Sequence, residues 1–116
     1  MKFIDIGHNF IFHVRNGNLT QIVSQYFTSK TIVEVTRLCN SKKEYRTLTP
    51  FCKYLQKVTI VQCKLENIEV ENNTLAFQVF MITKDKDGSI DLTEHAVTSF
   101  WNNNKITKHI HTIISY

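Results

Sequence analysis

The second half of the chain limits the fold most strongly, because it consists of four extended runs joined by very short connections. From Val58 onward the apolar residues recur at every second position, which is typical of β-strands. The runs are TIVQCKLENIEVE, TLAFQVFMIT, IDLTEHAVTSFW and KITKHIHTIIS. They are separated by Asn72-Asn73, by Asp85-Lys86-Asp87-Gly88 and by Asn102-Asn103-Asn104, which are residues that favour tight turns. This half therefore predicts an antiparallel meander.

The first half predicts helices around one short strand. Residues 3–14 carry apolar side chains three and four apart, which indicates a helix with one buried face. Asn16-Gly17-Asn18 should end it, and Asn18 can cap a second helix, LTQIVSQYF. The run TIVEV then predicts a strand, CNSKKEYR a loop, and TPFCKYLQKV a third helix with Thr49 as its cap and Pro50 in its first position. Residues 1–116 are thus expected to form one α+β domain, with three helices on one face of a sheet.

The last hairpin determines which side chains share a face of this sheet. If 102–104 is a three-residue loop, Val97 lies opposite His109 and His95 lies opposite His111. One face then carries His95, Val97, Ser99, Trp101, Thr107, His109, His111 and Ile113. The other carries Ala96, Thr98, Phe100, Ile106, Lys108, Ile110, Thr112 and Ile114. A two-residue loop would shift the register by one and move His95 to the opposite face. Hydrophobicity alone favours burying the second face.

The element order resembles that of the nuclear transport factor 2-like superfamily, which includes ketosteroid isomerases and SnoaL-like polyketide cyclases. The segments that carry the resemblance are RNGNLTQIVSQYF, TIVEV and HAVTSFWNNNKITKHI. It implies a cone in which three helices pack in the concave face of a strongly curved, mainly antiparallel sheet, with a pocket at one end. It also implies that His109, His111 and Ile113 face this pocket. We follow the resemblance here, against raw hydrophobicity.

The resemblance also bears on ketosteroid isomerase chemistry. The isomerase general base falls at Val35, the tyrosine of its oxyanion hole at Phe10, and the acid of its oxyanion hole at Val97. Isomerisation needs a base to move the proton and donors to hold the enolate. Because all three positions are apolar here, we do not expect ketosteroid isomerase activity.

Three interpretations of His95, His109 and His111 stay open. They could act as general acids or bases, because histidine titrates near neutrality. They could bind a metal ion, although no acidic residue is clearly placed to complete such a site, and we predict none. They could simply be hydrogen-bonded residues that line a pocket for a small hydrophobic molecule. The other residues expected to line this pocket are Phe10, Tyr26, Val35, Tyr54, Val97, Ser99, Trp101 and Ile113.

The outer sheet face and the composition set expectations about partners. Phe100, Ile106, Ile110 and Ile114 are expected to form an apolar outer face that is buried in a homodimer. The net charge of +4 is scattered, so we do not expect nucleic-acid binding. No apolar run is long enough for a membrane span or a signal peptide, which predicts a cytoplasmic protein. Three cysteines (Cys39, Cys52 and Cys63) fit neither a zinc spacing nor a closed disulfide set, and no cofactor is expected.

Overall fold

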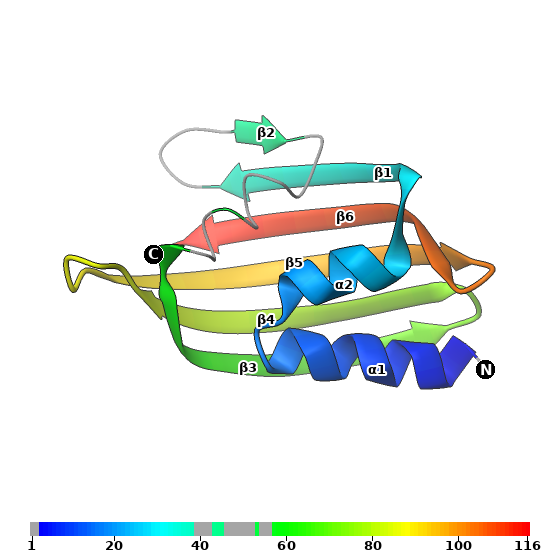
Figure 1. The fold of residues 1–116 in the computed structure, drawn as a ribbon, viewed down its shortest axis with the longest axis horizontal. Helices are drawn as coiled ribbons and strands as arrows, with labels where there is room; N and C mark the ends of the chain where they lie inside the picture. Colours follow the sequence, from blue (N-terminus) through cyan, green and yellow to red (C-terminus); the bar gives the residue numbers. More distant parts are fainter. Residues whose placement is uncertain (1–2, 39–42, 46–52, 54–56) are drawn as a thin grey trace.

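A six-stranded sheet with two helices on one of its faces forms the framework of the chain (Figure 1). The computed structural model describes residues 3–38, 43–45, 53 and 57–116. Its helices are α1 (Phe3–Arg15) and α2 (Leu19–Tyr26). Its strands are β1 (Phe27–Leu38), β2 (Lys43–Tyr45), β3 (Thr59–Glu71), β4 (Thr74–Lys84), β5 (Ile90–Asn102) and β6 (Lys105–Ser115). The predicted α+β class is confirmed, but the described part of the chain contains two helices rather than three. The expected third helix falls mainly on residues outside the described ranges.

The sheet has the strand order β2-β1-β6-β5-β4-β3. The last four strands form the predicted antiparallel meander, while β1 pairs with β6 in parallel. The segment predicted as a loop contributes β2, which pairs antiparallel with β1. The parallel pair joins the N-terminal half of the chain to the last strand. As a result β6 lies inside the sheet, between β1 from the N-terminal half and β5 from the C-terminal half.

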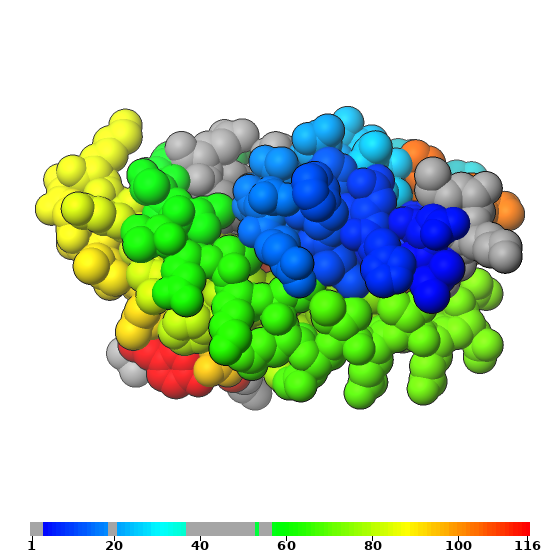
Figure 2. Space-filling view, turned by 90° about the horizontal axis from the view of Figure 1, so that it is seen from below, coloured from blue at the N-terminus to red at the C-terminus, as the bar shows by residue number. Residues whose placement is uncertain are grey.

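The two helices cover the inner face of the sheet because their apolar stripes point toward it. Ile6 and Phe10 of α1 and Ile22 of α2 are fully buried. Gly17 ends α1 with a left-handed backbone (φ +73°), as the sequence predicted. Asn18 lies at the N-cap of α2, but its side chain makes no capping hydrogen bond. Figure 2 shows α1 (dark blue) lying along the edge strand β3 (green), and the Cys63 thiol donates to the Val14 carbonyl at 3.4 Å.

The last hairpin differs from the predicted register in two ways, which together shift the pairing by two residues and keep the predicted face, so the predicted pairs Val97–His109 and His95–His111 are wrong. Only Asn103 and Asn104 form its loop, both with positive φ, so the three-residue loop was wrong. This turn would place His95 on the opposite face. However, the register shifts again between Phe100 and Trp101, where Thr107 is an extra, bulged residue on β6. The bulge restores the shared face, with Val97 opposite His111 and Ser99 opposite His109.

The bulge also corrects the assignment of two residues on β6. Ile106 was placed on the outer face, but it is 1% exposed and belongs to the core. Thr107 was placed on the inner face, but it is exposed and its hydroxyl donates to the Phe100 carbonyl at 3.1 Å. Both residues change sides because the strand alternation restarts after the bulge. His109, His111 and Ile113 are buried as the resemblance implied.

Aromatic rings fill much of the space between helices and sheet. Phe10 packs against Tyr26, Phe77 and Trp101 with ring centroids 5.5–5.9 Å apart, and Tyr26 lies 5.1 Å from Trp101. A smaller core of Val33, Val35 and Ile113 forms between β1 and β6. The aromatic cluster therefore occupies the interior and leaves a cavity beside it.

None of the helices in the described ranges is long and apolar enough to cross a membrane.

Candidate functional site

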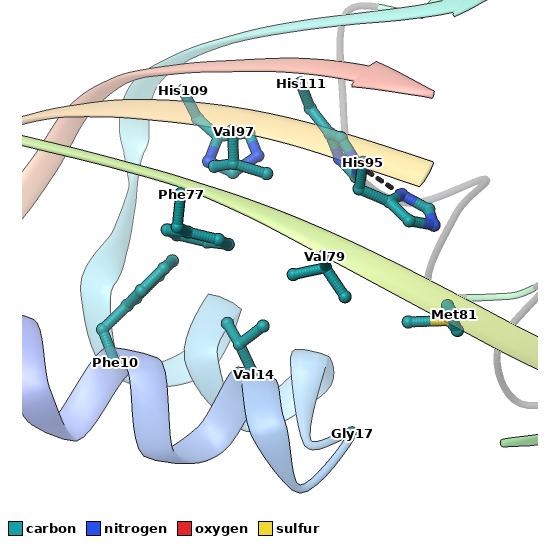
Figure 3. Close-up of a pocket in the computed structure, with 10 residues that line it drawn as sticks. All are labelled: Phe10, Val14, Gly17, Phe77, Val79, Met81, His95, Val97, His109 and His111. Carbon is teal, nitrogen blue, oxygen red and sulfur yellow. Dashed lines mark hydrogen bonds between the residues drawn. The ribbon is translucent and has the colours of Figure 1, made fainter. Parts of the chain in front are cut away.

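A small cavity lies between α1, the turn after it and the inner face of strands β4 to β6 (Figure 3). Its volume is about 40 Å³, which is room for about three water molecules. The lining residues are Phe10, Val14, Gly17, Phe77, Val79, Met81, His95, Val97, His109 and His111. Seven of these ten residues are apolar or glycine, and the other three are histidines. The imidazoles therefore supply the polar side chains of the wall.

A buried hydrogen-bonded chain links two of the histidines to a threonine. The Thr93 hydroxyl lies 2.8 Å from Nε2 of His95, and Nδ1 of His95 lies 2.8 Å from Nε2 of His111. All three side chains are at most 5% exposed. One proton serves the bond between the two rings, so the tautomer of His95 fixes the tautomer of His111. The chain thus holds both rings in defined orientations.

His109 differs from these two histidines because its ring has no hydrogen-bond partner. It is 2% exposed, and neither Nδ1 nor Nε2 bonds to any residue in the described part of the chain. Its ring centroid lies 5.3 Å from that of Phe27 and 5.6 Å from that of His111. Burying polar atoms without partners costs free energy, commonly about 1–3 kcal/mol per group. Native structures rarely accept this cost without a reason.

Burial keeps the imidazoles of His109 and His111 neutral at physiological pH. It lowers the pKa of His109 from 6.5 to about 4. Burial, followed by the neighbouring His95 and His109, lowers the pKa of His111 well below its ordinary value. Each neutral ring carries one N–H donor and one acceptor nitrogen. The site can therefore offer hydrogen bonds in both directions, but no fixed charge.

Within the described ranges, no group of three or more His, Cys, Asp or Glu side chains is arranged to hold a metal ion. The reason lies in the hydrogen-bonded chain: His95 and His111 turn nitrogens toward each other rather than toward a common centre. Cys63 is half-buried on β3, while Cys39 and Cys52 lie outside the described residues.

The structure brings five of the predicted site residues together around the cavity, namely Phe10, His95, Val97, His109 and His111. Ser99 and Trp101 instead bond to each other, with the indole Nε1 donating to the Ser99 hydroxyl at 2.9 Å. Tyr26 is hydrogen-bonded to the side chain of Asn9, and Val35 and Ile113 lie in the smaller core. Tyr54 lies outside the described residues. A role for any of them in ligand binding stays a prediction.

Sequence reasoning missed several residues that line or support the cavity. Phe77, Val79 and Met81 follow a strict alternation on β4, which could have identified its inner face. Thr93 lies two positions before His95, and the same alternation puts it on the same face. Val14 lies four residues after Phe10 on the same face of α1, and Gly17 lies in the turn that follows this helix.

Comparison with known proteins identifies the fold. No family model and no curated protein matches the sequence. Among solved structures, a candidate SnoaL-like polyketide cyclase from Mesorhizobium loti is similar, with a TM-score of 0.70, 13% identity and coverage of 96% of this chain and 98% of that one. A candidate isomerase from Rhodopseudomonas palustris has a TM-score of 0.68, 9% identity and coverage of 97% and 90%. An NTF2-like protein of unknown function from Cytophaga hutchinsonii has a TM-score of 0.62, 12% identity and coverage of 95% and 97%. The chain therefore has the NTF2-like cone fold that the sequence resemblance implied.

Proposed function

We propose that this protein binds a small, mainly apolar molecule in the cavity beside His109, without ketosteroid isomerase chemistry. One observation carries the proposal: a deeply buried imidazole with two unpartnered nitrogens borders an otherwise apolar cavity. A ligand that reaches His109 would replace missing hydrogen bonds and fill empty space at once. Phe10, Val35 and Val97 are buried and apolar, which supports the absence of the isomerase machinery.

The size of the cavity limits what can enter without rearrangement. A volume of about 40 Å³ is well below the roughly 150 Å³ of an engineered cavity that binds benzene. A larger ligand would therefore place only one end here, or would displace Val14 and Met81, two of the four aliphatic side chains in the wall. Val14 is only partly buried and lies on the last turn of α1, so it has room to move.

A matched pair of variants tests the cavity as the binding site. Val97→Ile adds one methylene group to the cavity wall, whereas Val33→Ile adds the same group to the smaller core. Xenon and small apolar compounds, when titrated into the protein, should shift the methyl NMR signals of Val97 and Met81 until the site is saturated. Val97→Ile should weaken this binding at least fivefold, and Val33→Ile should leave it unchanged. If no compound shifts these signals, xenon included, the proposed function is wrong.

We also propose that the outer sheet face forms a homodimer. Ile106 lies in the core, so the apolar outer face that we expected keeps Phe100, Ile110 and Ile114. Phe100 is 38% exposed. Ile32 on β1 and Leu92 on β5 extend this apolar area, at 58% and 38% exposure. Sedimentation equilibrium at high micromolar concentration tests the proposal, and a monomer there would contradict it. Cytoplasmic localisation remains part of the proposal and is testable by fractionation.

An enzyme of the cyclase, isomerase or dehydratase kind is a second candidate, because the Thr93–His95–His111 chain resembles the way proteins orient a general base. His109 and His111 are neutral near pH 7, so neither would supply a proton, and burial makes both weaker bases than a free imidazole. Replacing His111 with Gln would abolish turnover of a substrate under this hypothesis. Unchanged turnover would exclude His111 as the base.

A further inference from the structure

We infer that the part of the ligand that enters the cavity is a neutral hydroxyl or carboxamide group on a short aliphatic arm, bonded to His109. The inference rests on the proposed function and specifies the chemistry of the ligand. It rests on three properties of the site, which are the vacant bonding positions of His109, the absence of charge and the volume.

The vacant positions belong to a side chain that the fold holds in place. His109 lies on β6 between β1 and β5, opposite Val33 and Ser99 in register. Its ring packs at 53° to Phe27 and at 87° to His111. These ring contacts satisfy neither nitrogen, and no described residue does so either. Among the described residues the polar complement is missing, and we infer that a molecule in the cavity supplies it.

The absence of charge decides against ionic ligands. None of the ten lining residues is Lys, Arg, Asp or Glu. Burial also opposes protonation of His109, so the imidazole offers no positive charge to an anion. A carboxylate, phosphate or ammonium group would lose its hydration without gaining a counter-ion, which is strongly unfavourable. The group that enters is therefore neutral.

The two kinds of nitrogen in a neutral imidazole select among neutral groups. One nitrogen donates and the other accepts, and the tautomer decides which is which. Hydroxyl and carboxamide groups can both donate and accept, so they can pair with either nitrogen in either tautomer. Ethers and ketones can only accept, and they match a single tautomer. The volume of about 40 Å³ then limits the arm to about three or four non-hydrogen atoms.

Two pairs of isosteric probes separate charge from shape. Acetamide and acetate have the same skeleton, as do 2-propanol and the isopropylammonium ion. Each probe is titrated at pH 7.5 while side-chain ¹⁵N and ¹³Cε1 signals of His109 and the methyl signals of Val97 and Met81 are recorded. Acetamide and 2-propanol should bind saturably, and each should bind at least tenfold more tightly than its charged isostere. In His109→Leu both neutral probes should lose at least fivefold in affinity, whereas the control variant Val33→Ile should bind them as the wild type does.

The outcomes distinguish this inference from the proposed function. If xenon binds but acetate binds as tightly as acetamide, the inference is wrong and the ligand-binding proposal stands. The same conclusion follows if His109→Leu binds both neutral probes as tightly as the wild type does. If neither xenon nor any of the four probes binds, both proposals fall.

Discussion

Acidification should destabilise this protein through His109, and the size of the effect follows from the burial of the ring. The pKa of His109 is lowered from 6.5 to about 4 in the folded chain. Between these values the unfolded chain takes up a proton that the folded chain excludes, so stability is lost as the pH falls. The loss begins near pH 6.5 and ends near pH 4. At about 1.4 kcal/mol for each pH unit, it approaches about 3.5 kcal/mol in total and reaches about 2.5 kcal/mol at pH 4.5.

Urea denaturation of wild type and His109→Leu at pH 7.5 and pH 4.5 measures this contribution. His111 adds a loss of the same sign, because its pKa is lowered too, so the wild type should lose more than His109 alone accounts for. His109→Leu should lose about 2.5 kcal/mol less than the wild type over this range. At pH 7.5 the variant should be as stable as the wild type or more stable by about 1–2 kcal/mol, because two unpartnered nitrogens are removed from the core.

A non-titrating polar variant, His109→Gln, separates charge from polarity. It should show the same reduced acid sensitivity as His109→Leu, but without the gain in stability at pH 7.5. An NMR titration of the His109 Cε1–H signal that gave a pKa near 6.5 would refute the reasoning. So would an acid loss in His109→Leu equal to that of the wild type.

Three further substitutions test separate parts of the structure. Thr93→Val removes the hydroxyl bonded to His95 and should cost about 1–2 kcal/mol in urea denaturation, with shifted side-chain ¹⁵N signals of His95; an unshifted spectrum would contradict the hydrogen bond. Gly17→Ala forces a left-handed backbone on alanine and brings its Cβ to 2.7 Å from Cδ1 of Ile60, so thermal unfolding should show a loss of about 1–2 kcal/mol; a more stable variant would exclude this conformation. Ile110→Lys should dissociate the proposed homodimer in sedimentation without destabilising the protomer, and a dimer of wild-type affinity would place the interface elsewhere.

The strands could be predicted from the sequence because their signals are local. Alternating apolar residues bounded by Asn, Asp and Gly mark β3 to β6, and the described strands agree with the predicted runs. The N-terminal helix was predicted for the same reason, since Ile6 and Phe10 lie on one face. The parallel pairing of β1 with β6 joins residues about 76 positions apart, and no local pattern in the sequence indicates it.

The register of the last hairpin could not be predicted, because three consecutive asparagines permit more than one turn. Two positive-φ residues form the tight turn that matches the twist of the strands, which favours a two-residue loop. The bulge at Thr107 then becomes necessary, because a strand with unbroken alternation cannot bury both Ile106 and His109. Ile106 lies in the core with the aromatic cluster, and His109 lies beside the cavity. Ile106 and His109 both point inward and lie three positions apart rather than two or four. This spacing is the feature of the sequence that indicates the bulge.

The same bulge explains why hydrophobicity alone selected the wrong face. The inner positions of β6 after the bulge are His109, His111 and Ile113, whereas the outer positions include Ile110 and Ile114. A chain selected only for stability would place the isoleucines inside, because each buried unpartnered imidazole nitrogen costs free energy. Violations of local rules tend to concentrate where a protein binds or reacts. The hydrogen bond of Thr93 to His95, and that of His95 to His111, offset part of this cost for these two histidines, but nothing in the described ranges offsets it for His109. His109 is therefore the residue whose burial most needs a ligand to explain it.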